Sequence, residues 1–326
     1  MNRNRPRAVL TESLAEHPAV QAWAVATGQE AEPKLLHVLR ERRVNAMYWI
    51  PGLGVNGAPV FAKRGRADQT RIERKVYEEI LPELPLTVPR YYGSALNGRF
   101  GWIFVEDVGN DRYCQAEPAH REVAARWLAT MHTESTRISA VRSLPDAGPG
   151  RYLQQLRDAR ARILSSLRSW SFGSDEVRVL KGILSECDTI EKRWDRVEAV
   201  GHGVPSTLAH CDFQEKNAFL KKDAGGLSIW LIDWEMAGFG HPAPDLTRID
   251  LQAYWHAIRP EWPSLSFEGV ERLACVGGLF QWLAAIAWES LSLQCEHQRD
   301  RADSVADLDR YLPRLSDAAR SAGVLE

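Results

Sequence analysis

A histidine, two aspartates and an asparagine follow one another in the second half of the chain at a spacing that could support phosphoryl chemistry. His210–Asn217 has the form H-x-D-x-x-x-x-N, and a strand-like segment ending in Asp233 comes after it. Asp212 could orient an attacking hydroxyl and accept its proton, while Asn217 and Asp233 could hold Mg²⁺ against nucleotide phosphates. A match to the first part arises by chance in roughly a few chains in a hundred. We expect His210 to be a structural hydrogen-bonding residue.

A β-hairpin would bring the two expected metal ligands together. Segments 217–220 and 228–232 are apolar and aromatic, as in short strands, and 221–226 between them carries a turn signal. Asn217 would begin one strand and Asp233 would follow the other. Two hard oxygen ligands on adjacent strand ends suit Mg²⁺, which takes few protein ligands and keeps several waters.

The run from His210 to Leu246 resembles the aminoglycoside phosphotransferase and choline kinase-like superfamily. The resemblance rests on H-x-D-x-x-x-x-N, then Ile-Asp-Trp-Glu at 232–235, then Gly-Phe-Gly-His-Pro-Ala-Pro-Asp-Leu at 238–246. It implies an α+β, bilobal protein-kinase-like fold with a small β-rich N-lobe and a larger, mainly helical C-lobe. It also implies ATP-dependent (or GTP-dependent) O-phosphorylation of a small molecule with Mg²⁺. Asp245 matches a downstream Asp of that family and is expected to be structural.

The same plan divides the chain into lobes. Residues 1–105 would form the N-lobe, a nucleotide-binding sheet with a helix, and 106–109 the hinge. Residues 110–326 would form the C-lobe with the catalytic loop, the metal site and the acceptor pocket. Backbone groups near Phe104, Glu106 and Val108 would then bond the nucleotide base.

Lys63 is the expected phosphate-binding lysine of the first lobe. It ends Val60-Phe61-Ala62-Lys63, which resembles the V-A-I-K strand of kinases. Strands are also expected at 35–39, 44–50, 88–93 and 101–105. A helix over 69–81 has Ile72, Val76 and Ile80 as its buried stripe, and Glu73 beside this stripe could fix Lys63 by an ion pair.

The segment Gly52–Gly57 is a literal G-x-G-x-x-G, but we interpret it as a hairpin turn. A dinucleotide fold needs a helix directly after the glycines, whereas an extended run follows here. No further strand fits between these glycines and Lys63, as a protein kinase would need. The phosphate-facing loop would instead be 40–45, which contains no glycine, with Asn45 at a polar position of the family loop.

The second lobe is expected to be mostly helical. Helices are predicted over 118–132, 152–170, 174–200, 246–258, 267–297 and 304–322, with Ser174 as an N-cap and Trp282 and Trp288 in the core. Glu235, Trp255 and Trp262 are candidates for the acceptor site, since tryptophan faces could cover a sugar, a base or a quaternary ammonium.

Composition excludes several classes of protein. The net charge is -2, so nothing global suggests nucleic-acid binding, and the five cysteines form no C-x-x-C pair. The N-terminus lacks a signal-peptide core, and the apolar stretch 279–288 is too short to span a bilayer. We expect a cytoplasmic protein that binds no membrane; its oligomeric state cannot be read from the sequence.

Several functions stay open at this point. The first choice is an antibiotic-inactivating kinase acting on a cationic acceptor, because residues 234–297 carry 8 acidic residues and 3 arginines; ordinary solvated helix faces explain this excess equally well. A metabolic kinase of the choline, homoserine or sugar type is the alternative. A protein kinase is disfavoured, because the link from Asp233 to Asp245 is short and contains no Ser or Thr. A non-catalytic kinase-like module is disfavoured because the expected catalytic residues are all present.

Overall fold

The computed structural model describes residues 6–223 and 226–325, and the chain divides into two compact units. The first comprises Met1–Leu144, His210–Gly238 and Arg248–Ala257, and the second comprises Pro145–Ala209, Phe239–Thr247 and Ile258–Glu326. The mixed α+β class, with an antiparallel sheet first and mainly helices after it, is confirmed. The predicted hinge lies inside the first unit, so the lobe boundary at 106–109 stays a prediction.

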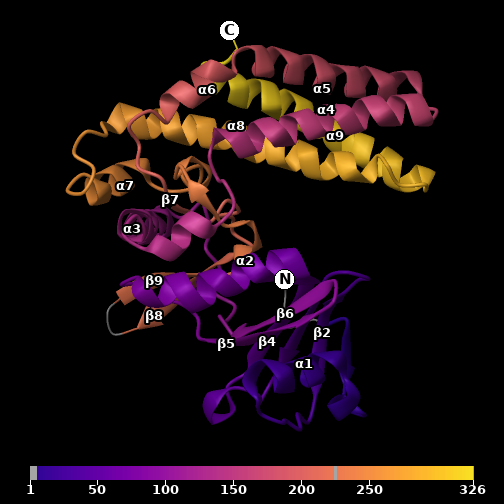
Figure 1. Ribbon diagram of the computed structural model, residues 1–326, viewed down its shortest axis with the longest axis vertical. Helices are drawn as coiled ribbons and strands as arrows, with labels where there is room; N and C mark the ends of the chain where they lie inside the picture. The colour runs from indigo at the N-terminus through magenta and orange to yellow at the C-terminus, as the bar shows by residue number, and fades with distance from the viewer. Residues whose placement is uncertain (1–5, 224–225, 326) are drawn as a thin grey trace. The chain divides into compact units, whose positions relative to one another are not determined.

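A six-stranded antiparallel sheet forms the N-terminal part of the first unit (Figure 1). Its strands, in chain order, are β1 Ala8–Leu10, β2 Leu36–Glu41, β3 Ala46–Ile50, β4 Val60–Arg66, β5 Tyr91–Asn97 and β6 Phe100–Glu106. In space they follow the order β1-β2-β3-β4-β6-β5. Every strand expected in this region is present, with ends shifted by a few residues.

The two faces of this sheet differ because side chains alternate along each strand. Even-numbered residues of β3, β4 and β6, such as Tyr48, Ala62 and Phe104, form a core with Trp23 of α1 (Pro18–Thr27). Odd-numbered residues of β4 and β6 face the opposite side. The second face is therefore the one that can carry a site.

Helix α2 (Ala67–Lys75) packs against β4, β5 and β6. It continues as a π-helical turn, Val76–Ile80, and a 3₁₀ turn, Leu81–Glu83. Glu73 is on its buried face and is 3% exposed, whereas Ile72 is only half-buried. The predicted buried stripe was therefore wrong at its first member, since Glu73 is buried there in place of Ile72.

The rest of the first unit carries the segment with the H-x-D-x-x-x-x-N motif. It contains α3 (Pro118–Ser135), most of α7 (Leu251–Ile258) and the antiparallel hairpin of β8 (Ala218–Asp223) and β9 (Gly226–Leu231). The predicted hairpin is confirmed, although 224–225 of its turn lie outside the described residues, as do the first five residues examined for a signal peptide. Trp234, fully buried, packs against Trp127 of α3 with ring centroids 6.4 Å apart.

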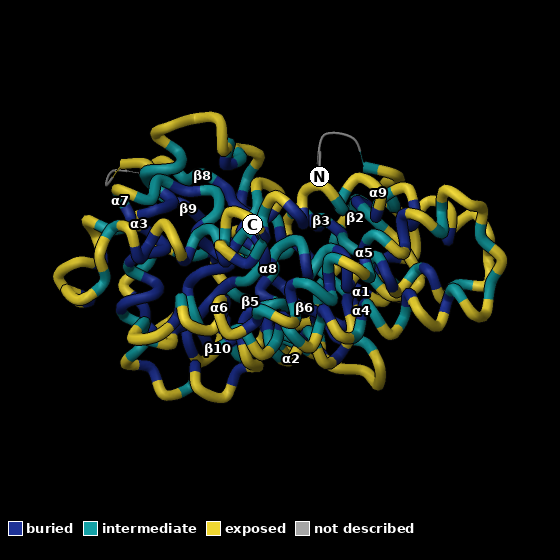
Figure 2. Tube along the Cα trace, turned by 90° about the horizontal axis from the view of Figure 1, so that it is seen from above, coloured by how far each residue is buried: buried dark blue, intermediate teal, exposed yellow. Residues whose placement is uncertain are grey.

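The second unit is a helical layer in which α4, α5, α8 and α9 run side by side (Figure 1). The helices of this unit are α4 Pro149–Ser169, α5 Ser174–Lys192, α6 Trp194–Val200, α8 Phe267–Ser292 and α9 Gln298–Ser321. Tyr152 stacks on Phe280 at 3.9 Å between α4 and α8. A short strand, β7 (Thr207–Ala209), pairs with β10 (Gly238–Gly240). In Figure 2 the traces of these helices change repeatedly between buried and exposed colours, as expected for amphipathic helices.

Several helix details differ from the prediction. The helix expected over 174–200 breaks at Arg193, and its N-cap is Gly173 rather than Ser174. The Gly173 amide donates to the Glu176 carboxylate at 2.7 Å, which satisfies the first turn without the Ser174 hydroxyl. Trp288 is 66% exposed, so its predicted place in the core was wrong.

One described helix, α8, is long and apolar enough to cross a membrane by length and composition alone. It extends well beyond the 279–288 stretch considered from the sequence, and 56% of the relevant window is buried inside the protein. Such burial is typical of a core helix, and α8 packs against α4 and α9.

Candidate active site

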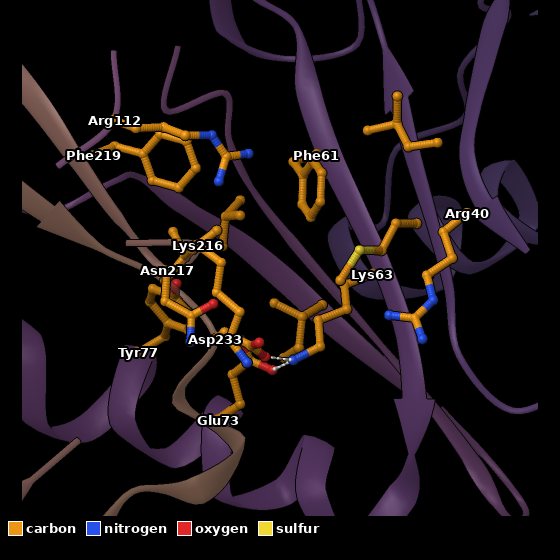
Figure 3. Close-up of a pocket in the computed structure, with 15 residues that line it drawn as sticks. Arg40, Phe61, Lys63, Glu73, Tyr77, Arg112, Lys216, Asn217, Phe219 and Asp233 are labelled. Atoms are coloured by element: carbon orange, nitrogen blue, oxygen red, sulfur yellow. Dashed lines mark hydrogen bonds and ion pairs between the residues drawn. The ribbon is translucent and has the colours of Figure 1, made fainter. Parts of the chain in front are cut away.

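A pocket lies within the first unit, on the face of the sheet opposite the core that contains Trp23 (Figure 3). One part of its lining is apolar and comes from β4, β6 and the hairpin: Phe61, Ile103, Val105, Phe219 and Ile232. The other part is charged or polar: Arg40, Lys63, Glu73, Arg112, Lys216, Asn217 and Asp233. A pocket with an apolar wall and a strongly polar end can hold a planar base with a charged tail.

Lys63 lies at the centre of a carboxylate cluster at the polar end. Its Nζ is 3.0 Å from Glu73 Oε2 and 2.9 Å from Glu235 Oε2, and it also bonds Asp233 Oδ1. The predicted pair between Lys63 and Glu73 is thus present in the structure. The sequence had not indicated the contacts with Asp233 and Glu235, which come from a segment 170 residues away.

The charges of this cluster shift one another. Burial lowers the pKa of Lys63, but Asp233, Glu73 and Glu235 outweigh it and raise that pKa well above its usual value. Burial raises the pKa of Glu73 to about 7, with Lys63 partly opposing the rise. Burial also raises the pKa of Asp233, but the Lys63 ammonium prevails and the net shift is downward. Lys63 is therefore a stable cation whose charge the carboxylates hold in place.

Asp212 is held as a hydrogen-bond acceptor in the loop before the hairpin. Its carboxylate accepts from Asn217 Nδ2 at 2.8 Å and from Gln214 Nε2, and it lies 3.0 Å from Lys216 Nζ. Asn217 and Lys216 both line the pocket. The Asp212 side chain is held by these donors and is still 21% exposed, so a substrate hydroxyl could reach it and transfer a proton to it.

His210 ties this loop to the hairpin. Its Nδ1 accepts from the Asp212 amide at 3.3 Å, and its Nε2 is 3.1 Å from the Ile232 carbonyl, so the neutral tautomer with a proton on Nε2 satisfies both contacts. The ring is fully buried and lies 4.6 Å from that of Trp234. These contacts agree with the structural role expected for His210.

Asn217 and Asp233 meet as the hairpin prediction requires. The Ile232 amide donates to the Asn217 carbonyl at 3.0 Å, so the two ends of the hairpin are bonded beside the pocket. The Asn217 amide nitrogen is used by Asp212, which leaves its oxygen as an acceptor. Asp233 has φ 72, a left-handed conformation that is costly for a non-glycine residue and is common at functional sites.

The residues around Asp233 fit a divalent cation. Ligand atoms of Glu73, Asp233 and Glu235 all lie within 4.8 Å of one another. Carboxylate and amide oxygens are the ligands that Mg²⁺ prefers. Glu235 was expected at the acceptor; its contact with Lys63 favours a place beside the metal ligands instead.

Val108 supplies an amide that a base could use. In the expected hinge, the amides of Glu106, Asp107 and Gly109 donate to Arg90, Pro59 and the Asp107 side chain respectively. Among the residues that the structure describes, the Val108 amide has no such acceptor, although Val108 is 2% exposed. A buried amide without a protein partner is a candidate contact for a ligand, although Val108 is not among the residues that line the pocket.

Other expected site residues lie apart from the pocket lining. The Phe104 side chain is fully buried in the core on the other face of the sheet, and the neighbouring Ile103 and Val105 line the pocket in its place. The Asn45 carbonyl closes a turn with the Arg42 amide at 2.9 Å. Trp262 is 6% exposed, so its ring is not free to stack on an acceptor, and this expectation was wrong. Trp255 is half-buried beside His256.

Gly52–Gly57 contributes nothing to the pocket lining, as expected. It connects β3 to β4, whose Ile50 and Val60 are paired, and the Gly54 amide donates to the Ala58 carbonyl at 2.8 Å. The hairpin-turn interpretation is confirmed. The pocket residues that sequence analysis missed are chiefly Arg112, Lys216 and Phe219, of which Lys216 had a signal because it lies inside the H-x-D-x-x-x-x-N run. Arg40 begins the loop 40–45 that was expected to face the phosphates, although it was not singled out.

The model of the phosphotransferase enzyme family matches residues 56–266, which is more than half of the chain. The chain belongs to this family. The match includes Lys63, the H-x-D-x-x-x-x-N loop and the hairpin, so it covers most of the residues that line the pocket, and the chain is a phosphotransferase. A search of curated proteins found no match.

Solved structures share the fold of this phosphotransferase at low sequence identity. A spectinomycin phosphotransferase, APH(9)-Ia, in complex with ADP and spectinomycin has a TM-score of 0.58 at 12% identity, covering 94% of this chain and 98% of the other. Choline kinase from Cryptosporidium parvum has a TM-score of 0.59 at 13% identity, covering 89% of this chain and 91% of the other. Plasmodium vivax ethanolamine kinase has a TM-score of 0.54 at 16% identity, covering 87% of this chain and 82% of the other. At these identities the likeness establishes the kinase-like fold.

Proposed function

We propose that this enzyme transfers the γ-phosphoryl group of ATP, or GTP, to a hydroxyl of a small molecule. The observation that carries the proposal is the polar pocket end lined by Lys63, Asn217 and Asp233, with the Asp212 carboxylate hydrogen-bonded to Asn217 beside it. Asp212 accepts the proton of the attacking hydroxyl, and Lys63 binds phosphate oxygens. The base lies against the apolar wall and takes a hydrogen bond from the Val108 amide.

Asn217 and Asp233, with Glu235 beside them, would hold Mg²⁺. The ion neutralises charge on the phosphates during transfer. Lys63 bonds the same carboxylates that would hold the ion, so its ammonium would be released from Asp233 toward phosphate oxygens if the ion were bound there. The Glu73 contact keeps Lys63 in the pocket during this exchange.

The acceptor is a small molecule because the segment after Asp233 is too short to present a polypeptide. Twelve positions separate Asp233 from Asp245, without a Ser or Thr that could be phosphorylated. Among enzymes of the same fold, one is a spectinomycin phosphotransferase and others are choline and ethanolamine kinases. An amine-bearing antibiotic is the first candidate, and a metabolic amino alcohol is the second. A cytoplasmic location, where ATP is available, is part of the proposal.

An ATP-consumption screen tests this function. The purified protein is incubated with ATP, Mg²⁺ and separate panels of aminocyclitol and aminoglycoside antibiotics, macrolides, choline and ethanolamine, and sugars. We expect acceptor-dependent ADP release with one panel and a mass gain of one phosphoryl group on the acceptor. Protein phosphorylation without transfer to any small molecule would contradict the proposal.

A further inference from the structure

Arg40 faces the pocket because of an irregularity in β2. Val38 pairs with Tyr48 and Arg40 pairs with Met47, so Leu39 is an extra residue between two successive pairs. If β2 were regular at this point, Arg40 would lie on the same face of the sheet as Val38, which is in the hydrophobic core. With it, Leu39 and Arg40 both line the pocket. Bulges near active sites often redirect a side chain in this way.

Arg40 and Lys63 flank one row of the sheet. Arg40 pairs with Met47, and Met47 pairs with Lys63, so the three lie across β2, β3 and β4 on the same face. Neighbouring strands are about 4.8 Å apart, which places the two basic residues roughly 10 Å apart at their Cα atoms. Figure 3 shows both side chains extending along the pocket, with the Arg40 guanidinium on the side of Lys63.

The two cations differ in their partners. Lys63 contacts three carboxylates, whereas the Arg40 guanidinium makes no hydrogen bond or ion pair within 6–223 and 226–325. A half-buried guanidinium directed into a pocket keeps its five N–H donors for a ligand. Its planar fork matches two phosphate oxygens at once.

Backbone groups of the loop after Arg40 are already hydrogen-bonded within the protein. The Arg42 amide donates to the Asn45 carbonyl at 2.9 Å, and Arg64 donates to the carbonyls of Arg42 at 3.0 Å and Val44 at 3.4 Å. Glycine-rich phosphate loops work differently, because without Cβ atoms their amides can approach the phosphates closely. This loop has no glycine between residues 40 and 45.

We propose that Arg40 binds the polyphosphate of the nucleotide and takes over the task of a glycine-rich loop. The inference rests on the proposed function, since it concerns the nucleotide of the same pocket. Lys63 and Arg40 then contact the phosphates from two strands, one beside the metal ligands and one beyond Met47. The loop 41–45 serves as a fixed support, held by Arg64, rather than as a cover that closes on the phosphates.

Calorimetric titration with ADP and with adenosine, both in Mg²⁺ buffer, tests the role of Arg40. Arg40→Gln should weaken ADP binding about ten- to hundred-fold, since a hydrogen-bonded ion pair with phosphate is worth about 1.5–3 kcal/mol. Adenosine binding should stay unchanged. Arg40→Lys, which keeps the charge but not the fork, should lose less. Arg43→Gln is the matched control, because Arg43 is an exposed arginine of the same loop.

The outcomes separate this proposal from the one it rests on. If wild type binds ADP and Arg40→Gln binds it within two-fold, the role of Arg40 is refuted and the proposed function stands. If Arg40→Gln and Arg43→Gln weaken ADP binding equally, the overall charge of the loop is responsible and the assignment to Arg40 fails. If wild type binds neither ADP nor GDP, the proposed function itself fails, and the Arg40 inference with it. An unchanged melting temperature of Arg40→Gln shows that the variant is folded.

Discussion

Replacing Lys63 by Met should destabilise the protein and strengthen its binding of a divalent cation in the absence of nucleotide. The Lys63 side chain is 12% exposed, and its carboxylate partners Glu73, Asp233 and Glu235 are 4%, 21% and 23% exposed. Removing the ammonium leaves three poorly solvated carboxylates facing one another. Breaking a buried ion pair by removing one partner typically costs about 3–5 kcal/mol.

At about 2.1 cal/mol/K per residue, that loss corresponds to a fall in melting temperature of roughly 4–7 °C for a chain of 326 residues. The assay is thermal unfolding with and without 10 mM Mg²⁺, in the absence of nucleotide. Mg²⁺ should raise the melting temperature of Lys63→Met more than that of wild type, because the ligand atoms within 4.8 Å then lack a competing ammonium.

Lys75→Met is the control for losing a lysine from an ion pair. Lys75 pairs with Glu79 at 2.9 Å on the surface of α2, and such pairs contribute about 0.5 kcal/mol or less. The reasoning is refuted if Lys63→Met unfolds within 1 °C of the control. It is also refuted if Mg²⁺ stabilises wild type and Lys63→Met by the same amount.

Two further predictions concern the pH response and the backbone of the site. Burial raises the pKa of Glu73 to about 7, so lowering the pH from 8 to 6 should protonate Glu73 and weaken its ion pair with Lys63. The KM for ATP should therefore rise over this range in wild type, whereas it should stay constant in Glu73→Gln. Cys211 has φ 63, so Cys211→Val should lower stability by about 1–2 kcal/mol in denaturant titrations, whereas Cys211→Gly should not; equal losses in both would exclude backbone strain as the cause.

The arrangement of the segment that carries the H-x-D-x-x-x-x-N motif was predictable from sequence because its residues lie close together in the chain. Asp212, Asn217 and Asp233 lie within 22 residues, and a hairpin with a clear turn signal connects them. Lys63 and Glu73 were predictable for a similar reason, since a strand leading into a helix fixes their relation. In each case the residue types, the spacing and the local element point to the same arrangement.

The rest of the pocket depends on contacts that no local pattern shows. A single extra residue in β2 decides which face Arg40 takes, and a one-residue shift reverses every side chain of a strand. The availability of the Val108 amide depends on which neighbours bond Arg90 and Pro59. Trp262 follows a charged residue, Glu261, and is 6% exposed, whereas Trp288 follows Ala287 and is 66% exposed, because tertiary packing decides burial.

The central claim is that Asp212 accepts the proton of an acceptor hydroxyl while the nucleotide is held by other groups. The most direct test measures acceptor phosphorylation and ADP affinity together, for wild type and Asp212→Asn. We predict a loss of turnover of about 10²–10⁴-fold with ADP affinity within a few-fold of wild type, because Asn keeps the size of the side chain but cannot take the proton. Turnover of Asp212→Asn close to that of wild type would contradict the account.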